Sequence, residues 1–184
     1  SIGKNTLGCS VGASLKTKYA LNKDGRFDLE GLEKGIINEI ENELFIAKTS
    51  GSKRNYDFAI SRNIVAIYRD LLEGGKPQLL FYIKCELSSS DIKQVFKNKK
   101  DSKSKEQKKL LRDGSELLFL EPDKITLKID ELIYEKPNGL KKRYKTLPSA
   151  NASIALVLQY KKQTETRVIT RNRSIDKQNG AESK

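Results

Sequence analysis

The residues best suited to chemistry in this chain are lysines, which lie close together in two segments. Between Lys93 and Arg112, nine basic side chains accompany two acidic ones, a local charge of +7. From Lys136 to Lys184, twelve basic side chains accompany three acidic ones, a local charge of +9. The 184 residues carry a net charge of +12 and a pI near 9.6, so everything outside the two segments sums to −4. The excess charge is therefore localised, which predicts contact with a polyanion.

The candidate polyanion-binding side chains are basic residues at short spacing: Lys97, Lys99, Lys100, Lys103, Lys105, Lys108, Lys109, Lys141, Lys142, Arg143 and Lys145. Lysine is a point charge without a planar fork, which suits non-specific phosphate contact. No aromatic residue lies between Phe96 and Phe119, so base stacking is not expected there. Tyr144 stands among the second group and indicates RNA contact. Such a cluster would equally bind an anionic lipid surface, and the sequence leaves both open.

Enzymatic chemistry is not expected. The chain has no histidine, which removes the usual catalytic triads, the commonest general base and the commonest metal ligand. Cys9 and Cys85 are its only cysteines, so they form neither a disulfide framework nor a zinc signature, and a reducing intracellular setting is favoured. Cys9 would lack a base if it acted as a nucleophile. We therefore predict a protein without enzymatic activity, cofactor or metal.

Two patterns resemble functional motifs but fail on position. A phosphate loop follows a strand and opens a helix, whereas Gly74-Gly75 is expected to end a helix and precede a strand. Metal-dependent nuclease chemistry would need clustered carboxylates followed by a Glu-x-Lys-like pair on adjacent strands, a pattern that Asp123, Asp130, Glu131, Glu135 and Lys136 superficially suggest. Glu135 and Lys136 are adjacent and would face opposite sides of a strand, so the spacing does not fit.

The elements that must position these residues predict an α+β fold, in which a mostly antiparallel sheet carries one principal helix packed on it. Residues 1–23 are interpreted as a flexible N-terminal arm and residues 24–162 as a single α+β domain. Residues 93–112 form a flexible basic loop within that domain, and 163–184 form a flexible basic tail. No stretch approaches 18 apolar residues, so any membrane contact would be peripheral.

Hydrophobic periodicity places the individual elements. Ile36, Ile40 and Leu44 alternate with acidic residues and predict a strand over 35–48, although a helix over 29–42 would also fit. Apolar residues at three- and four-residue steps predict the principal helix over 57–72, closed by Gly74-Gly75. The remaining predicted elements are strands over 79–87, 117–120, 125–129, 132–134 and 154–160, a short helix over 91–97 and a turn over 137–139.

One stretch resembles the central part of rhabdovirus matrix proteins. Its parts are a strand ending near Ala47, a basic turn over 51–56, the helix over 57–72, the turn Gly75-Lys76-Pro77, the strand over 79–87 and the serines at 88–90. The late strand over 153–160 is also similar to that family's last strand. The overlap covers about 60 of the 184 residues, estimated from the motifs alone.

The resemblance implies a virion protein that self-associates and bridges the nucleocapsid to the inner face of an envelope. Its partners would be nucleoprotein or RNA, an anionic membrane surface and further copies of the chain. Its location would be the virion and the host cell interior, in the cytoplasm and possibly the nucleus. The family's N-terminal lysine cluster and proline-rich budding motif are missing here, which favours a plant-infecting relative. An RNA-binding viral accessory protein, such as a movement protein or silencing suppressor, and a small coat protein remain alternatives.

Overall fold

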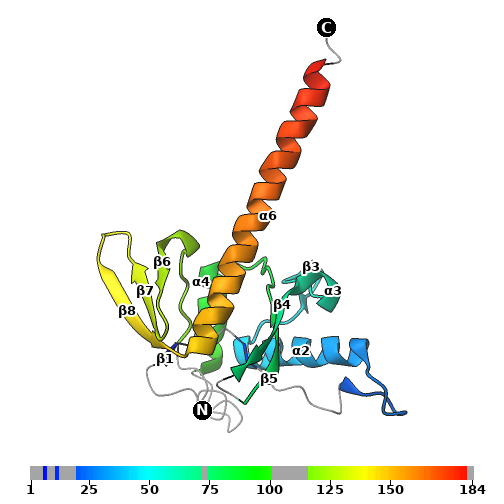
Figure 1. Cartoon of the computed structure of the whole chain (residues 1–184). Coiled ribbons are helices and arrows are strands. Elements are labelled where there is room, and N and C mark those ends of the chain that lie inside the picture. Colours follow the sequence, from blue (N-terminus) through cyan, green and yellow to red (C-terminus); the bar gives the residue numbers. More distant parts are fainter. Residues whose placement is uncertain (1–5, 8–10, 13–19, 72–73, 101–115, 182–184) are drawn as a thin grey trace.

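The computed structural model describes residues 6–7, 11–12, 20–71, 74–100 and 116–181. Helices and antiparallel strands are mixed along the chain, which confirms the predicted α+β fold class (Figure 1). The elements in chain order are β1 (Thr6–Leu7), α2 (Leu29–Leu44), β2 (Thr49–Ser50), β3 (Lys53–Arg54), α3 (Ile60–Asn63), β4 (Ile64–Asp70), β5 (Lys76–Phe81), α4 (Ser89–Lys100), η2 (Pro122–Lys124), β6 (Ile125–Leu127), β7 (Glu131–Glu135), β8 (Lys141–Thr146) and α6 (Pro148–Ala181).

The largest sheet has four strands in the order β1-β8-β7-β6. Its strands are antiparallel except for β1, which pairs parallel with the end of β8. The β7–β8 hairpin turns at 136–140, where Gly139 has a φ of 77° that favours glycine. The predicted turn at 137–139 is thus confirmed. The strand predicted over 125–129 is shortened to the three residues of β6. The strand predicted over 117–120 is wrong, since that segment forms no strand pairing with the described residues.

Helix α2 replaces the strand predicted over 35–48, so that prediction is wrong and its helical alternative is correct. Ile36, Ile40 and Leu44 lie four residues apart, a step that fits both a strand's period of two and a helical turn. The Asp28 side chain settles the start, because its carboxylate accepts a hydrogen bond from Gly31 N at 3.1 Å. Phe45, with a φ of 58°, ends the helix in the left-handed conformation.

The glutamates of α2 bind neighbouring segments by accepting hydrogen bonds from the backbone N–H groups of those segments. Glu33 accepts a hydrogen bond from Ile60 N at 2.7 Å, Glu41 from Lys48 N at 3.2 Å and Glu43 from Gly12 N at 3.2 Å. A charged acceptor makes each of these bonds stronger than a neutral one. The acidic residues that made α2 difficult to assign from sequence therefore fix the segments packed around it.

The principal helix predicted over 57–72 is wrong. The α-helix described there is the short α3, and β4 continues directly from it and pairs with β5. The segment 64–68 is rich in β-branched and aromatic residues, which pack well on a sheet, and this preference overrides the helical spacing. Gly74 and Gly75, with φ of 72° and 79°, close the loop of this hairpin rather than the end of a helix. The predicted strand over 79–87 is shifted, and β5 ends at Phe81.

The main core lies between α2, the segment that follows it and α4. Its buried members are Ile40, Ile46, Tyr56, Phe58 and Ile92. The Phe58 and Phe81 rings meet edge to face at 5.4 Å between centroids, which joins the β4–β5 hairpin to this core. Helix α4 contributes Ile92 and contains the short helix predicted over 91–97.

Helix α6 replaces the last predicted strand, so that prediction is wrong, and it continues through Ala181 into the segment predicted as a basic tail. Alternate apolar residues from Ile154 to Tyr160 suggested a strand, but Ala155 and Val157 between them are also apolar and fit a helix. Pro148 begins the helix, where a missing N–H costs nothing. Figure 1 shows α6 crossing the molecule and extending beyond its other elements.

Parts of the predicted N-terminal arm belong to the fold. Thr6 and Leu7 pair with Lys145 and Thr146, and Val11 packs against the main core. In the predicted flexible loop over 93–112, the residues up to Lys100 lie in α4, and residues 101–115 lie outside the described part of the chain.

Candidate polyanion-binding surface

Strand β8 carries the second group of predicted site residues. Lys141, Lys142, Arg143 and Lys145 are all exposed. Successive side chains of a strand point to opposite faces, so Lys141, Arg143 and Lys145 lie on one face and Lys142 on the other. Residues 136–145 contain five basic side chains and no acidic one. The hairpin therefore presents positive charge on both faces of the sheet.

The face with Lys141, Arg143 and Lys145, called the outer face below, also carries the glutamates of β7. Arg143 lies 3.1 Å from Glu131, and Lys141 lies 3.8 Å from Glu135. Lys128 also reaches Glu131, at 3.5 Å. Ion pairs this exposed contribute about 0–1 kcal/mol each. A denser array of negative charge can therefore displace the glutamates at small cost.

Lys145 completes an open hollow on this outer face, which is lined by Lys128, Asp130, Glu131, Arg143 and Lys145. Three of these five side chains are cations and two are anions. Lys145 has no ion-pair partner within 4 Å among the described residues. The hollow is thus a place where an anionic group would meet several cations at once.

The opposite face of the hairpin, called the inner face below, holds Lys142 beside aromatic rings. The Lys142 ammonium lies over the Tyr144 ring, 4.8 Å from its centroid. Tyr134 lies opposite Lys142 in the β7–β8 register. Tyr134 was not among the predicted site residues, because no strand was expected over 141–146. The turn at 137–139, flanked by residues of strand preference, was the signal that could have paired the two segments.

Lys124 in η2 lies next to Ile125, the partner of Tyr134 in the β6–β7 register. A hydrogen bond from Lys124 to Glu121 raises the pKa of the ammonium, and the nearby Tyr134 and Glu135 raise it further. The two charged atoms of Lys124 and Glu121 are 2.9 Å apart. Lys124 thus stays charged at neutral pH, beside the tyrosine of the inner face.

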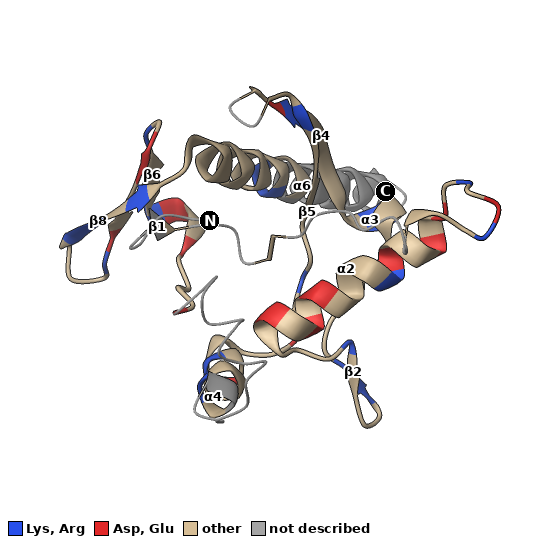
Figure 2. Ribbon diagram, turned by 90° about the horizontal axis from the view of Figure 1, so that it is seen from below, with Lys and Arg blue, Asp and Glu red and all other residues tan. Residues whose placement is uncertain are grey.

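Helix α4 holds the first members of the other predicted basic group. Lys97 is exposed, and the backbone of Lys99 and Lys100 forms the end of the helix. Lys103, Lys105, Lys108 and Lys109 lie outside the described residues. Lys93, one turn before Lys97, sits 5.1 Å from the centroid of the Phe119 ring. Figure 2 shows α4 well apart from β8, so the two basic groups do not form one continuous patch within the described part.

The start of α4 is fixed by a reciprocal cap. Ser88 Oγ accepts a hydrogen bond from Asp91 N at 3.1 Å, and the Asp91 carboxylate accepts from Ser88 N at 3.3 Å. This arrangement satisfies two backbone donors at the helix start. It orients α4 so that Ile92 enters the core and Lys93 and Lys97 remain exposed.

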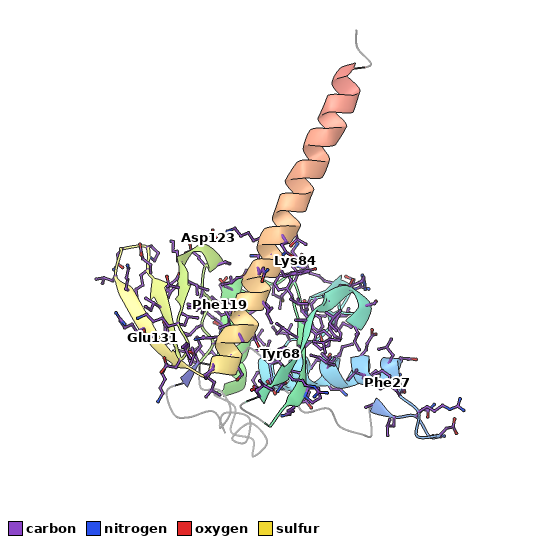
Figure 3. All side chains as sticks on the ribbon, viewed as in Figure 1. Phe27, Tyr68, Lys84, Phe119, Asp123 and Glu131 are labelled. Carbon is purple, nitrogen blue, oxygen red and sulfur yellow. The ribbon has the colours of Figure 1, made fainter. Side chains whose placement is uncertain are left out.

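The carboxylates weighed as a nuclease site do not gather into one cluster, although Asp130 and Glu131 line the same hollow. Figure 3 places Asp123 and Glu131 at opposite ends of the sheet, and Glu135 pairs with Lys141. Within the described ranges, no group of three or more acidic or cysteine residues could hold a metal ion. Cys85 is a free thiol packed against the core, and Cys9 lies outside the described residues.

No helix among the described residues is long and apolar enough to cross a membrane. Comparisons with models of protein families, with curated proteins and with solved structures each found no match to this chain.

Proposed function

We propose that this chain is a non-enzymatic structural protein of viral matrix type, which binds polyanions through β8 and α4 and associates with further copies of itself. The observation that carries the proposal is that every cation of β8 is exposed. The segment that contains them, residues 136–145, has no acidic residue. In this role the hairpin would attach to the phosphates of a nucleoprotein complex or of an anionic membrane.

The support for a matrix-type role comes from charge and exposed surface rather than from matched elements. Three elements that carried the resemblance have different secondary structure: the strand ending near Ala47, the helix over 57–72 and the strand over 153–160. What remains is the separation of charge seen in Figure 2, with acidic residues along α2 and basic residues on β8 and α4. A protein that bridges two partners needs such distinct surfaces.

Self-association would use the β4–β5 hairpin. Ile67 and Leu79 are cross-strand partners and are 69% and 40% exposed. They lie on the face opposite Tyr68, which bonds to Ser153 of α6. A two-fold axis can bring this apolar face of one copy against the same face of a second copy. The β4–β5 hairpin of each copy also has strand edges that pair with no further strand among the described residues, and such edges can pair with another chain.

A charge-removal series tests the polyanion site. Replacing Lys141, Arg143 and Lys145 together with Gln should weaken binding to vesicles with anionic lipid by about 100-fold, at about 1 kcal/mol for each charge. The matched control replaces Lys23, Arg26 and Lys53 with Gln, which removes the same charge from exposed positions elsewhere. Equal losses in both triple variants would show that net charge alone drives binding and would contradict a site on β8.

An RNA-binding accessory protein is the second candidate, favoured by the two tyrosines beside Lys142. Wild-type protein that binds single-stranded RNA tightly but does not co-sediment with anionic vesicles would favour this candidate over the matrix-type role.

A further inference from the structure

The inner face of the β7–β8 hairpin carries two tyrosines side by side. In the β7–β8 register, Leu132 lies opposite Tyr144, and Tyr134 lies opposite Lys142. Tyr134 and Tyr144 are therefore diagonal neighbours on one face, a relation that separates Cα atoms by about 7–8 Å and remains within reach of aromatic rings.

Burial along this face changes from the base of the hairpin to its tip. Leu132 and Thr146, at the base, are 0% and 2% exposed. Tyr134 and Tyr144 are both partly exposed, and Lys142, nearest the tip, is exposed. The base thus anchors the hairpin in the fold, while the rings retain surface that a ligand can contact.

Cations lie near both rings. Lys142 lies over the Tyr144 ring and opposite Tyr134 in the strand register, and the ion pair of Lys124 with Glu121 is near enough to Tyr134 to interact with it electrostatically. The two glutamates of β7 are on the outer face, where they pair with Lys141 and Arg143. An aromatic surface flanked by cations suits ligands that combine flat bases with phosphates.

We propose that Tyr134, Tyr144 and Lys142 form a stacking platform for single-stranded nucleic acid, in which bases stack on the two rings and Lys142 contacts the phosphate backbone. The inference rests on the proposed polyanion-binding function and specifies its partner. A lipid headgroup or a base-paired duplex would meet the cations of the hairpin, but it would offer no free base to the rings. The platform therefore distinguishes a single strand from these other polyanions.

The test measures binding of a fluorescently labelled single-stranded oligouridylate, with inorganic polyphosphate as the probe that has phosphates but no bases. Tyr134→Leu and Tyr144→Leu should each weaken oligouridylate binding by about 5- to 100-fold, the range for loss of one stacked base. Tyr134→Phe and Tyr144→Phe keep the ring and should bind like the wild type. Polyphosphate affinity should not change in any of the four variants.

A tryptophan reporter gives a second readout on a folded variant. The chain has no tryptophan, so Tyr144→Trp introduces a single one, and oligouridylate should quench its emission whereas polyphosphate should not. Unchanged oligouridylate affinity in both leucine variants, or equal quenching by the two probes, would overturn the platform. If the wild type bound none of the three probes (oligouridylate, polyphosphate and anionic vesicles), the underlying polyanion-binding function would instead be overturned.

Discussion

At the scale of single residues, the hydroxyl of Tyr56 is a polar group buried in the core. The side chain is 2% exposed, and its hydroxyl has no hydrogen-bond partner among the described residues. Burial raises the pKa of Tyr56 to about 12, with the charges of Glu41 and Cys85 contributing. The hydroxyl thus stays neutral at physiological pH and brings no bond that offsets its desolvation.

Tyr56→Phe should leave the free energy of unfolding unchanged or raise it by about 1 kcal/mol, because it removes an unpaired buried group. Urea unfolding followed by circular dichroism measures the difference. Tyr68→Phe is the matched control, since the Tyr68 hydroxyl lies 2.8 Å from Ser153 Oγ and its removal should cost about 1 kcal/mol. A loss of about 1 kcal/mol in Tyr56→Phe would show that its hydroxyl is bonded.

Asp57 makes stability depend on pH. A hydrogen bond from Arg62 Nη1 to Asp57 Oδ2 at 2.6 Å and the charges of Arg62 and Arg54 lower the pKa of the carboxyl below 3.8. A carboxyl with a lowered pKa in the folded state stabilises the protein above its unfolded pKa. This stabilisation is lost as pH falls through the folded value.

The wild type should therefore exceed Asp57→Asn in stability at about pH 6, and the difference should shrink toward about pH 3. Denaturant unfolding of both proteins across this range measures it. Arg62→Gln should reduce the same pH dependence by removing the closest cation. A difference between wild type and Asp57→Asn that stays constant with pH would contradict the assignment.

At the scale of elements, Asn151 joins α6 to the four-stranded sheet. Its buried amide nitrogen donates to the carbonyls of Lys128 at 2.6 Å and of Glu131 at 3.2 Å. These carbonyls flank the turn between β6 and β7, so one side chain fixes the position of the hairpin relative to the helix. Backbone carbonyls buried without a partner are costly.

Asn151→Ala should lower the free energy of unfolding by about 1–3 kcal/mol, because it leaves those carbonyls without their donor. The exposed Asn42 on α2 provides the control, and Asn42→Ala should change stability by at most about 0.5 kcal/mol. Equal stability of the two variants in urea would show that the Asn151 contacts do not hold α6 in place.

The sequence predicted the fold class, helix α4 and the β7–β8 turn, because each depends on local patterns with one interpretation. Other elements depend on contacts that local patterns do not contain. The helical spacing at 60–71 gave way to pairing of β4 with β5, and the alternation at 154–160 gave way to the long helix α6. On the candidate surface, the cations of β8 were predicted, whereas Tyr134 and Glu131 were placed beside them only by the strand register.

At the scale of the whole molecule, one apolar surface and one charged surface face solvent on separate hairpins. The apolar face of β4–β5 predicts self-association, and Ile67→Lys should weaken it by placing charges between two copies. Ile129→Lys is the control, since Ile129 is 81% exposed on the loop between β6 and β7. Sedimentation velocity over a concentration series should show less association for Ile67→Lys only. Equal association of both variants would place the interface elsewhere.

The most direct test of the central claim is polyanion binding by the wild-type protein across a salt series. Co-sedimentation with phosphatidylserine-containing vesicles and anisotropy with single-stranded RNA would be measured side by side, with phosphatidylcholine vesicles as the uncharged control. We expect binding to both anionic partners, little binding to the uncharged vesicles, and a linear fall of log affinity with log salt concentration. A wild-type protein that bound neither the anionic vesicles nor the RNA at low salt would contradict the proposed polyanion binding.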